Sequence, residues 1–144
     1  MKQKSGKFFE VSVAYEKNCE DGLVRKTVDK VVVEAFSCGE AETRVLEEIA
    51  PVSCGETECL DIVTAPYKEI FFADSGDIFF KAKIRIITLS DNGKEKKTTI
   101  YHLTNAENIE CARKNIVEAY GGSMLDYTIS GLNETKITEV YEKK

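Results

Sequence analysis

The feature that most constrains this chain is an internal repeat. Residues 8–50 and residues 79–121 follow the same pattern, and the two stretches align without a gap. The matched positions are Phe8-Phe9 with Phe79-Phe80, Asp21-Gly22 with Asn92-Gly93, Lys26-Thr27 with Lys97-Thr98, Ser37 with Asn108, and Ala41 with Ala112. A repeat of this kind predicts two related halves rather than one long irregular domain.

Each copy begins with the alternation of apolar and polar residues that is typical of a half-buried strand. The pairs Asp21-Gly22 and Asn92-Gly93 then supply the residues that a tight hairpin turn requires. Return strands rich in Val, Thr, Ile and Tyr are expected over residues 25–34 and 96–103. The apolar members of the opening strands are Phe9, Val11, Val13 and Tyr15 in the first copy and Phe80, Ala82, Ile84 and Ile86 in the second.

A helix is expected after each hairpin. Ser37 and Glu40 form a capping box, and Asn108 is an equally good N-cap at the matching position. Pro51 ends the first helix and Gly121-Gly122 ends the second. The apolar stripes are Ala41, Val45, Leu46 and Ile49 in the first helix and Ala112, Ile116, Val117 and Tyr120 in the second.

A third strand and a short last strand are expected to complete each copy. The third strands cover residues 60–64 and 127–132, and the last strands cover residues 69–71 and 139–141. Each copy is therefore a β-β-α-β unit with one extra short strand.

These elements predict an α+β fold with one domain over residues 1–144. The domain consists of two pseudo-symmetric β-β-α-β repeats, residues 8–72 and residues 79–141. One such unit is too small to bury its own apolar face well. We therefore expect the two repeats to share a core, with both helices on one face of an antiparallel sheet.

Composition narrows the class of protein. No apolar run approaches the roughly 20 residues of a membrane-spanning helix, and the basic start lacks the apolar stretch of a signal peptide. We therefore expect a cytoplasmic protein that does not contact a membrane. The net charge of −5 is too mild to exclude nucleic acid, because the distribution of charge matters more than its total.

The cysteines fit a reducing compartment. They are odd in number and form no C-x-x-C pair, which favours free thiols. Cys54 and Cys59 are close enough to suggest a metal or redox site, but His102, the only histidine and the nearest further zinc ligand type, lies far away in sequence. We expect neither a metal nor a cofactor. The five cysteines are Cys19, Cys38, Cys54, Cys59 and Cys111.

Four motifs together resemble an uncharacterised family, domain of unknown function 4494, from gut bacteria and their phages. The motifs are Ala41-Glu42-Thr43-Arg44, Gly76-Asp77-Ile78-Phe79-Phe80-Lys81, Gly93-Lys94-Glu95-Lys96-Lys97-Thr98 and Met124-Leu125-Asp126-Tyr127-Thr128-Ile129. The resemblance covers nearly the whole chain and implies a phage or mobile-element protein. It implies no activity and no catalytic residues.

The residues themselves show no catalytic signature. His102 would have to be the general base of a nucleophile–base pair, but it lies in a predicted strand, where a neutral, hydrogen-bonded or surface histidine is commoner. Gly121-Gly122-Ser123 follows a helix, so it does not place a helix N-terminus against a phosphate. We expect a protein that is not an enzyme.

The strongest candidate site is electrostatic. Lys81, Lys83 and Arg85 project from one face of one strand, whereas the matching strand of the first copy carries Glu10, Ser12 and Ala14. Such a face can simply keep a strand soluble, or it can follow a phosphate backbone beside an aromatic residue. The candidate ligand-binding residues are Lys81, Lys83, Arg85, Lys94, Lys96, Lys97 and Tyr101.

Three functions remain open from the sequence. The first is binding of a phosphate-rich ligand, most simply single-stranded nucleic acid. The second is sequestration of a small nucleotide signal, as in an anti-defence role. The third is a protein–protein interaction module. A homo-oligomer is compatible with each of the three.

Overall fold

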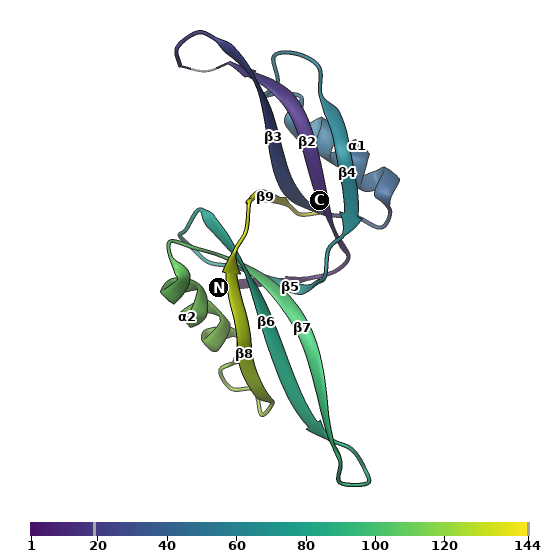
Figure 1. Cartoon of the computed structure of the whole chain (residues 1–144), viewed down its shortest axis with the longest axis vertical. Helices are drawn as coiled ribbons and strands as arrows, with labels where there is room; N and C mark the ends of the chain where they lie inside the picture. The colour runs from purple at the N-terminus through teal and green to yellow at the C-terminus, as the bar shows by residue number, and fades with distance from the viewer. Residues whose placement is uncertain (19, 144) are drawn as a thin grey trace. The chain divides into compact units, whose positions relative to one another are not determined.

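The computed structural model describes residues 1–18 and 20–143, so Cys19 and Lys144 lie outside the described residues. Figure 1 shows strands and helices in the order expected for a mixed α+β fold, which confirms that class. The elements are β1 (Lys2–Ser5), β2 (Phe8–Asn18), β3 (Val24–Glu34), α1 (Cys38–Ile49), β4 (Glu58–Thr64), β5 (Tyr67–Phe72), β6 (Ile78–Leu89), β7 (Glu95–Ala106), α2 (Ile109–Tyr120), β8 (Asp126–Glu134) and β9 (Ile137–Tyr141).

The strands form two sheets that are not wholly antiparallel, which differs from the antiparallel sheet expected from the sequence. One sheet has the order β1-β5-β7-β6-β8 and the other has the order β4-β2-β3-β9. Each contains a parallel pair, β5 with β7 in one and β3 with β9 in the other. The physical reason is that alternation indicates which face of a strand is buried, but it does not indicate which strand lies beside it.

The chain divides into two compact units that do not coincide with the two repeats. The β2–β3 unit contains residues 7–65 and 136–144, and the β6–β7 unit contains residues 1–6 and 66–135. Strand β5 follows β4 in sequence but belongs to the β6–β7 unit. Strand β9 follows β8 but belongs to the β2–β3 unit. The last strand of each predicted repeat is thus exchanged for that of the other.

In the β2–β3 unit, α1 covers one face of the sheet. Ser37 Oγ accepts a hydrogen bond from the Glu40 amide at 3.2 Å, and the Glu40 carboxylate accepts one from the Phe36 amide at 3.0 Å. This geometry confirms the predicted capping box. The core beneath the helix consists of Phe9, Val11, Val13, Tyr15, Val31, Val33, Ala35, Ala41, Val45 and Ile49.

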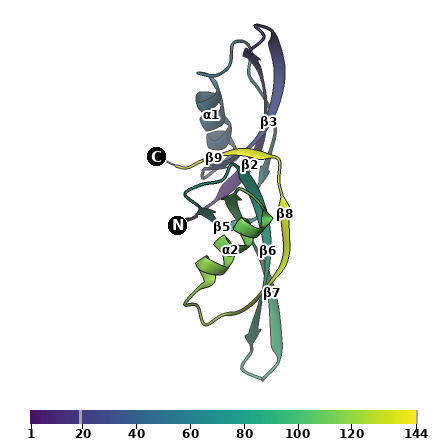
Figure 2. The ribbon, with the colours of Figure 1, turned by 90° about the vertical axis from the view of Figure 1, so that its left-hand side faces the viewer.

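In the β6–β7 unit, α2 lies on one side of the sheet, as Figure 2 shows. Asn108 Oδ1 caps the helix by accepting a hydrogen bond from the Cys111 amide at 2.9 Å. Val117, expected in the apolar stripe, is instead 46% exposed. The buried core between α2 and the sheet consists of Ala112 and Ile116 from the helix together with Phe71, Phe80, Ala82, Ile84 and Ala106.

The segment before β6 is fixed by one asparagine and one glycine. The Asn105 side chain accepts a hydrogen bond from the Ala73 amide at 2.7 Å and donates to the carbonyls of Ala73 and Gly76 at 3.1 and 3.0 Å. Gly76 has a φ of 116°, and a Cβ there would lie 2.4 Å from backbone atoms of Ala106. Only glycine fits this close approach without displacing the backbone.

Candidate functional site

Alternation along β6 separates its charged side chains from the core. Ala82 and Ile84 are completely buried on the side that α2 covers. Because successive side chains in a strand point to opposite faces, Lys81, Lys83 and Arg85 lie on the face without the helix. The structure therefore groups these three cations as the sequence predicts.

Strand β7 adds two of the predicted residues to the same face. Tyr101 is directly opposite Lys83 in the antiparallel ladder, and Lys97 is opposite Ile87. Directly opposed residues of an antiparallel pair share a face. We call the set Lys81, Lys83, Arg85, Lys97 and Tyr101 the basic face.

Within the basic face, one cation contacts the aromatic ring. Lys81 Nζ lies 4.7 Å from the centroid of the Tyr101 ring, which is cation–π geometry. Both residues are half-buried. The contact therefore holds the Lys81 ammonium group and the tyrosine ring beside each other on adjacent strands.

The flanking strand β8 leaves the three β6 cations beside uncharged residues. Its register places Asn133, Gly131 and Thr128 next to Lys81, Lys83 and Arg85, respectively. Ser130 Oγ also donates a hydrogen bond to the Lys83 carbonyl at 3.2 Å, which anchors the irregular register at this point. The positive charge on β6 is therefore not offset by its direct neighbours on β8.

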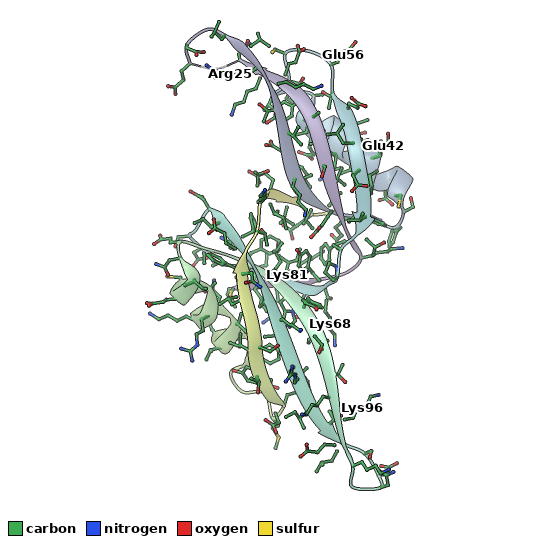
Figure 3. All side chains as sticks on the ribbon, in the orientation of Figure 1. Arg25, Glu42, Glu56, Lys68, Lys81 and Lys96 are labelled. Atoms are coloured by element: carbon green, nitrogen blue, oxygen red, sulfur yellow. The ribbon has the colours of Figure 1, made fainter. Side chains whose placement is uncertain are left out.

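Two predicted site residues lie apart from the basic face. Lys96 pairs with Thr88, so it points to the opposite side of the ribbon from Lys97. Lys94 lies in the turn, where its amide donates to Asn92 Oδ1 at 3.3 Å and its carbonyl accepts from Ser90 Oγ at 2.9 Å. Figure 3 shows Lys81 near the start of the ribbon and Lys96 near its hairpin end.

The matching face of the β2–β3 unit has a different character. Glu10 stands where the repeat places Lys81, and Lys30 stands where it places Tyr101. The two form an ion pair with Nζ and Oε2 3.2 Å apart. The charge on this face is thus compensated internally, whereas the β6 cations have no such carboxylate at the matching position.

A second group lies on the other side of the same sheet, where His102 contacts Tyr120, a partner that the sequence did not indicate. His102 is 2% exposed, and its Nε2 lies 2.6 Å from Tyr120 Oη. Burial lowers the pKa of His102, while the backbone and carboxylate of Glu69 raise it. Burial, aided by Glu69, raises the pKa of Tyr120 to about 12. The alternation of faces along the strands indicates the burial of His102, because His102 is directly opposite the core residue Ala82 and shares its face of the sheet.

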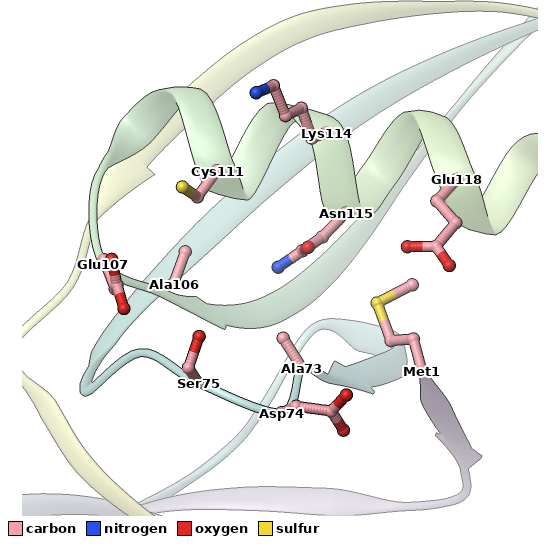
Figure 4. Close-up of a pocket in the computed structure, with 10 residues that line it drawn as sticks. All are labelled: Met1, Ala73, Asp74, Ser75, Ala106, Glu107, Cys111, Lys114, Asn115 and Glu118. Atoms are coloured by element: carbon pink, nitrogen blue, oxygen red, sulfur yellow. The ribbon is translucent and has the colours of Figure 1, made fainter.

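A cavity of about 300 Å³ lies beside α2, and Figure 4 shows its lining residues. Asn115 points into it but already donates hydrogen bonds to Thr104 Oγ1 at 3.1 Å and the Asn105 carbonyl at 3.0 Å. The charged lining residues are Asp74, Glu107, Glu118 and Lys114. Three carboxylates against one ammonium group do not suit a phosphate-rich ligand.

The described residues show neither a cluster of metal ligands nor a membrane-spanning helix. Across residues 1–18 and 20–143, no group of three or more His, Cys, Asp or Glu side chains is arranged to hold a metal ion. No helix in this part of the chain is both long and apolar enough to cross a bilayer. Burial raises the pKa of Cys59, with Glu42 and Asp61 adding to the effect, so this thiol is held in its protonated form.

The fold and the site together define a mixed α+β protein with a basic strand face on one of its sheets. The chain belongs to the family described as Domain of unknown function (DUF4494), whose model matches residues 7–143. No curated protein and no solved structure gives a significant match. The membership that the four sequence motifs indicate is therefore confirmed, and it brings no assigned activity.

Proposed function

We propose that this protein is a non-enzymatic binder of a phosphate-rich ligand, with single-stranded nucleic acid as the best candidate. The basic face is the binding surface in this proposal. The observation that carries it is the row of Lys81, Lys83 and Arg85 on one side of β6, with the Tyr101 ring beside it.

The geometry of a strand supports a chain-like ligand. Side chains two residues apart on a strand are separated by roughly 6.8 Å, so the three cations form a straight row about 14 Å long. A row of this kind can neutralise successive phosphates of one extended strand. A single small phosphate group would occupy only one or two of these positions.

Tyr101 supports recognition of bases in addition to phosphates. Every base has an aromatic face, and a tyrosine next to cations provides stacking without a demand for sequence. The Lys81 contact restricts the ring, so less conformational freedom is lost when a base stacks on it. These features favour single strands over duplex, in which the bases are already stacked.

We further propose that the two units descend from one duplicated β-β-α-β element. Both parallel pairs support this. The pairing of β9 with β3 shifts register between Lys30 and Val31, and that of β5 with β7 shifts between Tyr67 and Glu69. In the gapless alignment, Lys30 matches Tyr101, which is the partner of Tyr67. Retention of the same irregularity is typical of shared ancestry.

In this account the second repeat became a binding surface because its strand cations lost the partner carboxylate that the first repeat retains. The Glu10–Lys30 ion pair of one unit corresponds to the Lys81–Tyr101 contact of the other. We place the activity in the host cytoplasm, as expected for a phage or mobile-element protein, on the basis of the family resemblance. Sequestration of a small nucleotide and a protein-interaction or self-association role are the alternatives that the test separates.

The test compares two triple charge reversals of equal net charge. The first is Lys81→Glu, Lys83→Glu and Arg85→Glu on the basic face. The control, at exposed positions outside β6 and β7, is Lys26→Glu, Arg113→Glu and Lys136→Glu. Binding of a fluorescent single-stranded oligonucleotide is measured by anisotropy at low salt, and circular dichroism checks folding.

We expect the basic-face variant to lose oligonucleotide binding and the control to keep most of it. Equal losses in both variants would mean that only net charge matters and would contradict the proposal. Binding of mononucleotides but not of oligonucleotides by the wild-type protein would favour sequestration instead. A wild-type protein that binds neither would leave the interaction module as the better reading.

A further inference from the structure

Each sheet ends in one long strand edge. Strand β8 is the outer strand of one sheet and β4 the outer strand of the other, and in the described part of the chain neither has a strand on its outer side (Figure 1). They contain nine and seven residues, whereas the remaining outer strands, β1 and β9, contain four and five. A strand edge of this kind presents a row of amide and carbonyl groups to which another chain can add.

The two long edges share one irregularity. In β4 the pairing with β2 skips Leu60, and in β8 the pairing with β6 skips Ser130. An extra residue moves every later side chain to the other face relative to a regular partner strand. A regular strand therefore matches neither edge along its whole length, but two edges with the same extra residue can match each other.

An antiparallel register brings the two extra residues to the same level. When Glu58 is opposite Asn133 and Thr64 is opposite Tyr127, all seven residues of β4 have a partner on β8. In this register Leu60 and Ser130 lie side by side at the middle of the ladder.

The same register keeps the core side chains on one face. Cys59 and Ile62 pack against the core under α1, and Ile129 and Leu132 pack against the core under α2. Cys59 falls opposite Leu132, and Ile62 falls opposite Ile129. Both helices would thus lie on one side of a joined sheet.

Charges on the helix-free face are complementary. Glu58 is opposite Asn133, whose neighbour on β6 is Lys81. Asp61 falls at the level of Lys83. Each carboxylate is then two strands, or roughly 10 Å, from the backbone of a lysine, and the uncharged residues of β8 lie between them. Charges attract over about this distance at 0.1 M salt.

An apolar groove beside β8 accepts the helix side of an incoming strand. The groove has a volume of about 640 Å³ and lies between α2 and β8. Ile109 and Val117, on its helix wall, are 51% and 46% exposed. Its other apolar lining residues are Tyr127, Ile129 and Leu132, and Glu110 and Arg113 add one charge of each sign.

Pairing of like edges is electrostatically unfavourable. Two β8 edges in the equivalent antiparallel register would bring the β6 cations of both copies to opposite sides of the same two strands. Two β4 edges would bring together the carboxylates of Glu58 and Asp61 from both copies. Like charges at such distances repel, so charge selects the pairing of unlike edges.

We propose that the β8 edge of one copy binds the β4 edge of a second copy in this antiparallel register, which joins their sheets. Each copy has one edge of each kind, so the contact is head-to-tail and further copies can add. This inference goes beyond the proposed function and does not depend on nucleic-acid binding.

Amide hydrogen exchange of the wild-type protein locates the contact. One strand pair is a small interface, and we expect a Kd on the order of 0.1 mM. The full-length protein is therefore compared well below and well above this concentration, and sedimentation velocity gives the mass. We expect the mass to rise above that of one chain, with added protection in both β4 and β8 and none in β1. A mass that stays at one chain, or protection in only one of β4 and β8, overturns the proposal.

Two double charge reversals of equal net charge test the register. Glu58→Lys with Asp61→Lys should weaken the association by about threefold or more. The control, Glu20→Lys with Glu47→Lys, lies at exposed positions outside both edges and should retain it. Equal weakening in both variants overturns the register. If the first variant does not fold by circular dichroism, the exchange pattern of the wild-type protein decides.

The same variant separates this inference from the proposed function. Glu58→Lys with Asp61→Lys leaves every residue of the basic face in place, so in dilute solution it should bind the single-stranded oligonucleotide at least as well as the wild type does. Self-association without oligonucleotide binding would refute the proposed function alone. Oligonucleotide binding by a protein that stays at the mass of one chain would refute the edge pairing alone.

Discussion

Lys81 Nζ lies 4.7 Å from the ring centroid of Tyr101, although the two residues belong to different strands and Tyr101 is directly opposite Lys83. The contact is therefore diagonal across the ladder. It joins a positive charge and an aromatic ring on one face of the sheet. It also marks the position at which the other unit has its Glu10–Lys30 ion pair.

Removal of the Tyr101 ring is expected to weaken oligonucleotide binding. Tyr101→Ala should lower affinity by about fivefold or more, because stacking contributes about 1–3 kcal/mol per base. Tyr101→Phe keeps the ring and should stay within about threefold of the wild-type affinity. Fluorescence anisotropy with a single-stranded oligonucleotide measures both. Equal affinities for Tyr101→Ala and wild type would remove the tyrosine from the site.

Gly76→Ala is expected to destabilise the protein by about 2 kcal/mol or more. The new Cβ would lie 2.4 Å from backbone atoms of Ala106, and the φ of 116° is strained for any residue with a side chain. Urea unfolding followed by circular dichroism measures the change in the free energy of unfolding.

The control for Gly76 is Gly39→Ala in the first turn of α1. A Cβ at Gly39 meets no atom within 4 Å, and alanine favours a helix by about 1 kcal/mol. Stability should therefore be unchanged or slightly raised. A loss at Gly39 similar to that at Gly76 would show that the close approach to Ala106 is not the cause.

His102 is expected to make stability depend on pH below its ordinary pKa of 6.5. Burial lowers its pKa in the folded state, so the unfolded state binds a proton first as pH falls. The contribution of the neutral ring is thus fully present above pH 6.5. This contribution decreases as pH falls from 6.5 toward the lowered pKa. Glu69 raises the pKa of His102 and so makes the effect smaller, whereas Lys68 lowers the pKa and so makes the effect larger.

The measurement is the free energy of unfolding between pH 7.5 and pH 5.5 in wild type and in His102→Gln, which does not titrate in this range. We expect a smaller decrease in the variant. Parallel pH profiles for the two proteins would place the titration elsewhere.

Deletion of residues 136–144 is expected to loosen the β2–β3 unit selectively. It removes β9, the parallel partner of β3, together with the buried Ile137. The hydrogen bonds that it removes include those from Arg44 Nη2 to the Glu142 carbonyl at 2.9 Å and from the Lys143 amide to Glu34 Oε1 at 2.8 Å.

Amide hydrogen exchange measures this effect. Protection in β2 and β3 should decrease, and protection in β6 and β7 should be largely retained. An equal decrease in both hairpins would mean that the two units unfold as one. Full retention in β3 would mean that β9 contributes little.

Local features of the fold were predictable because their signals are local. The hairpin turns, the Ser37 and Asn108 caps and the helix ends depend on residues within a few positions of one another. The exchange of β5 and β9 was not predictable in this way. Residues 69–71 and 139–141 have the pattern of a short strand, and that pattern is satisfied equally well by either sheet.

The residues of the candidate site were likewise predictable only in part. The alternation of side chains along β6 is enough to separate Lys81, Lys83 and Arg85 from the core, so the sequence places them on one face correctly. For Lys96 and Lys97 the two-residue period puts only one on that face, and the register of the hairpin decides that it is Lys97. The contacts of His102 with Phe71 and Tyr120 join distant segments, and no single stretch of sequence indicates them.

The most direct test of the central claim is the salt dependence of single-stranded oligonucleotide binding to the wild-type protein. If three or four cations of the basic face each neutralise one phosphate, the slope of log K against log salt should be about −2 to −3. Affinity at 50 mM salt should then exceed affinity at 200 mM salt by a factor of about 20 to 60. Absence of binding at low salt, or a slope near zero, would contradict the account.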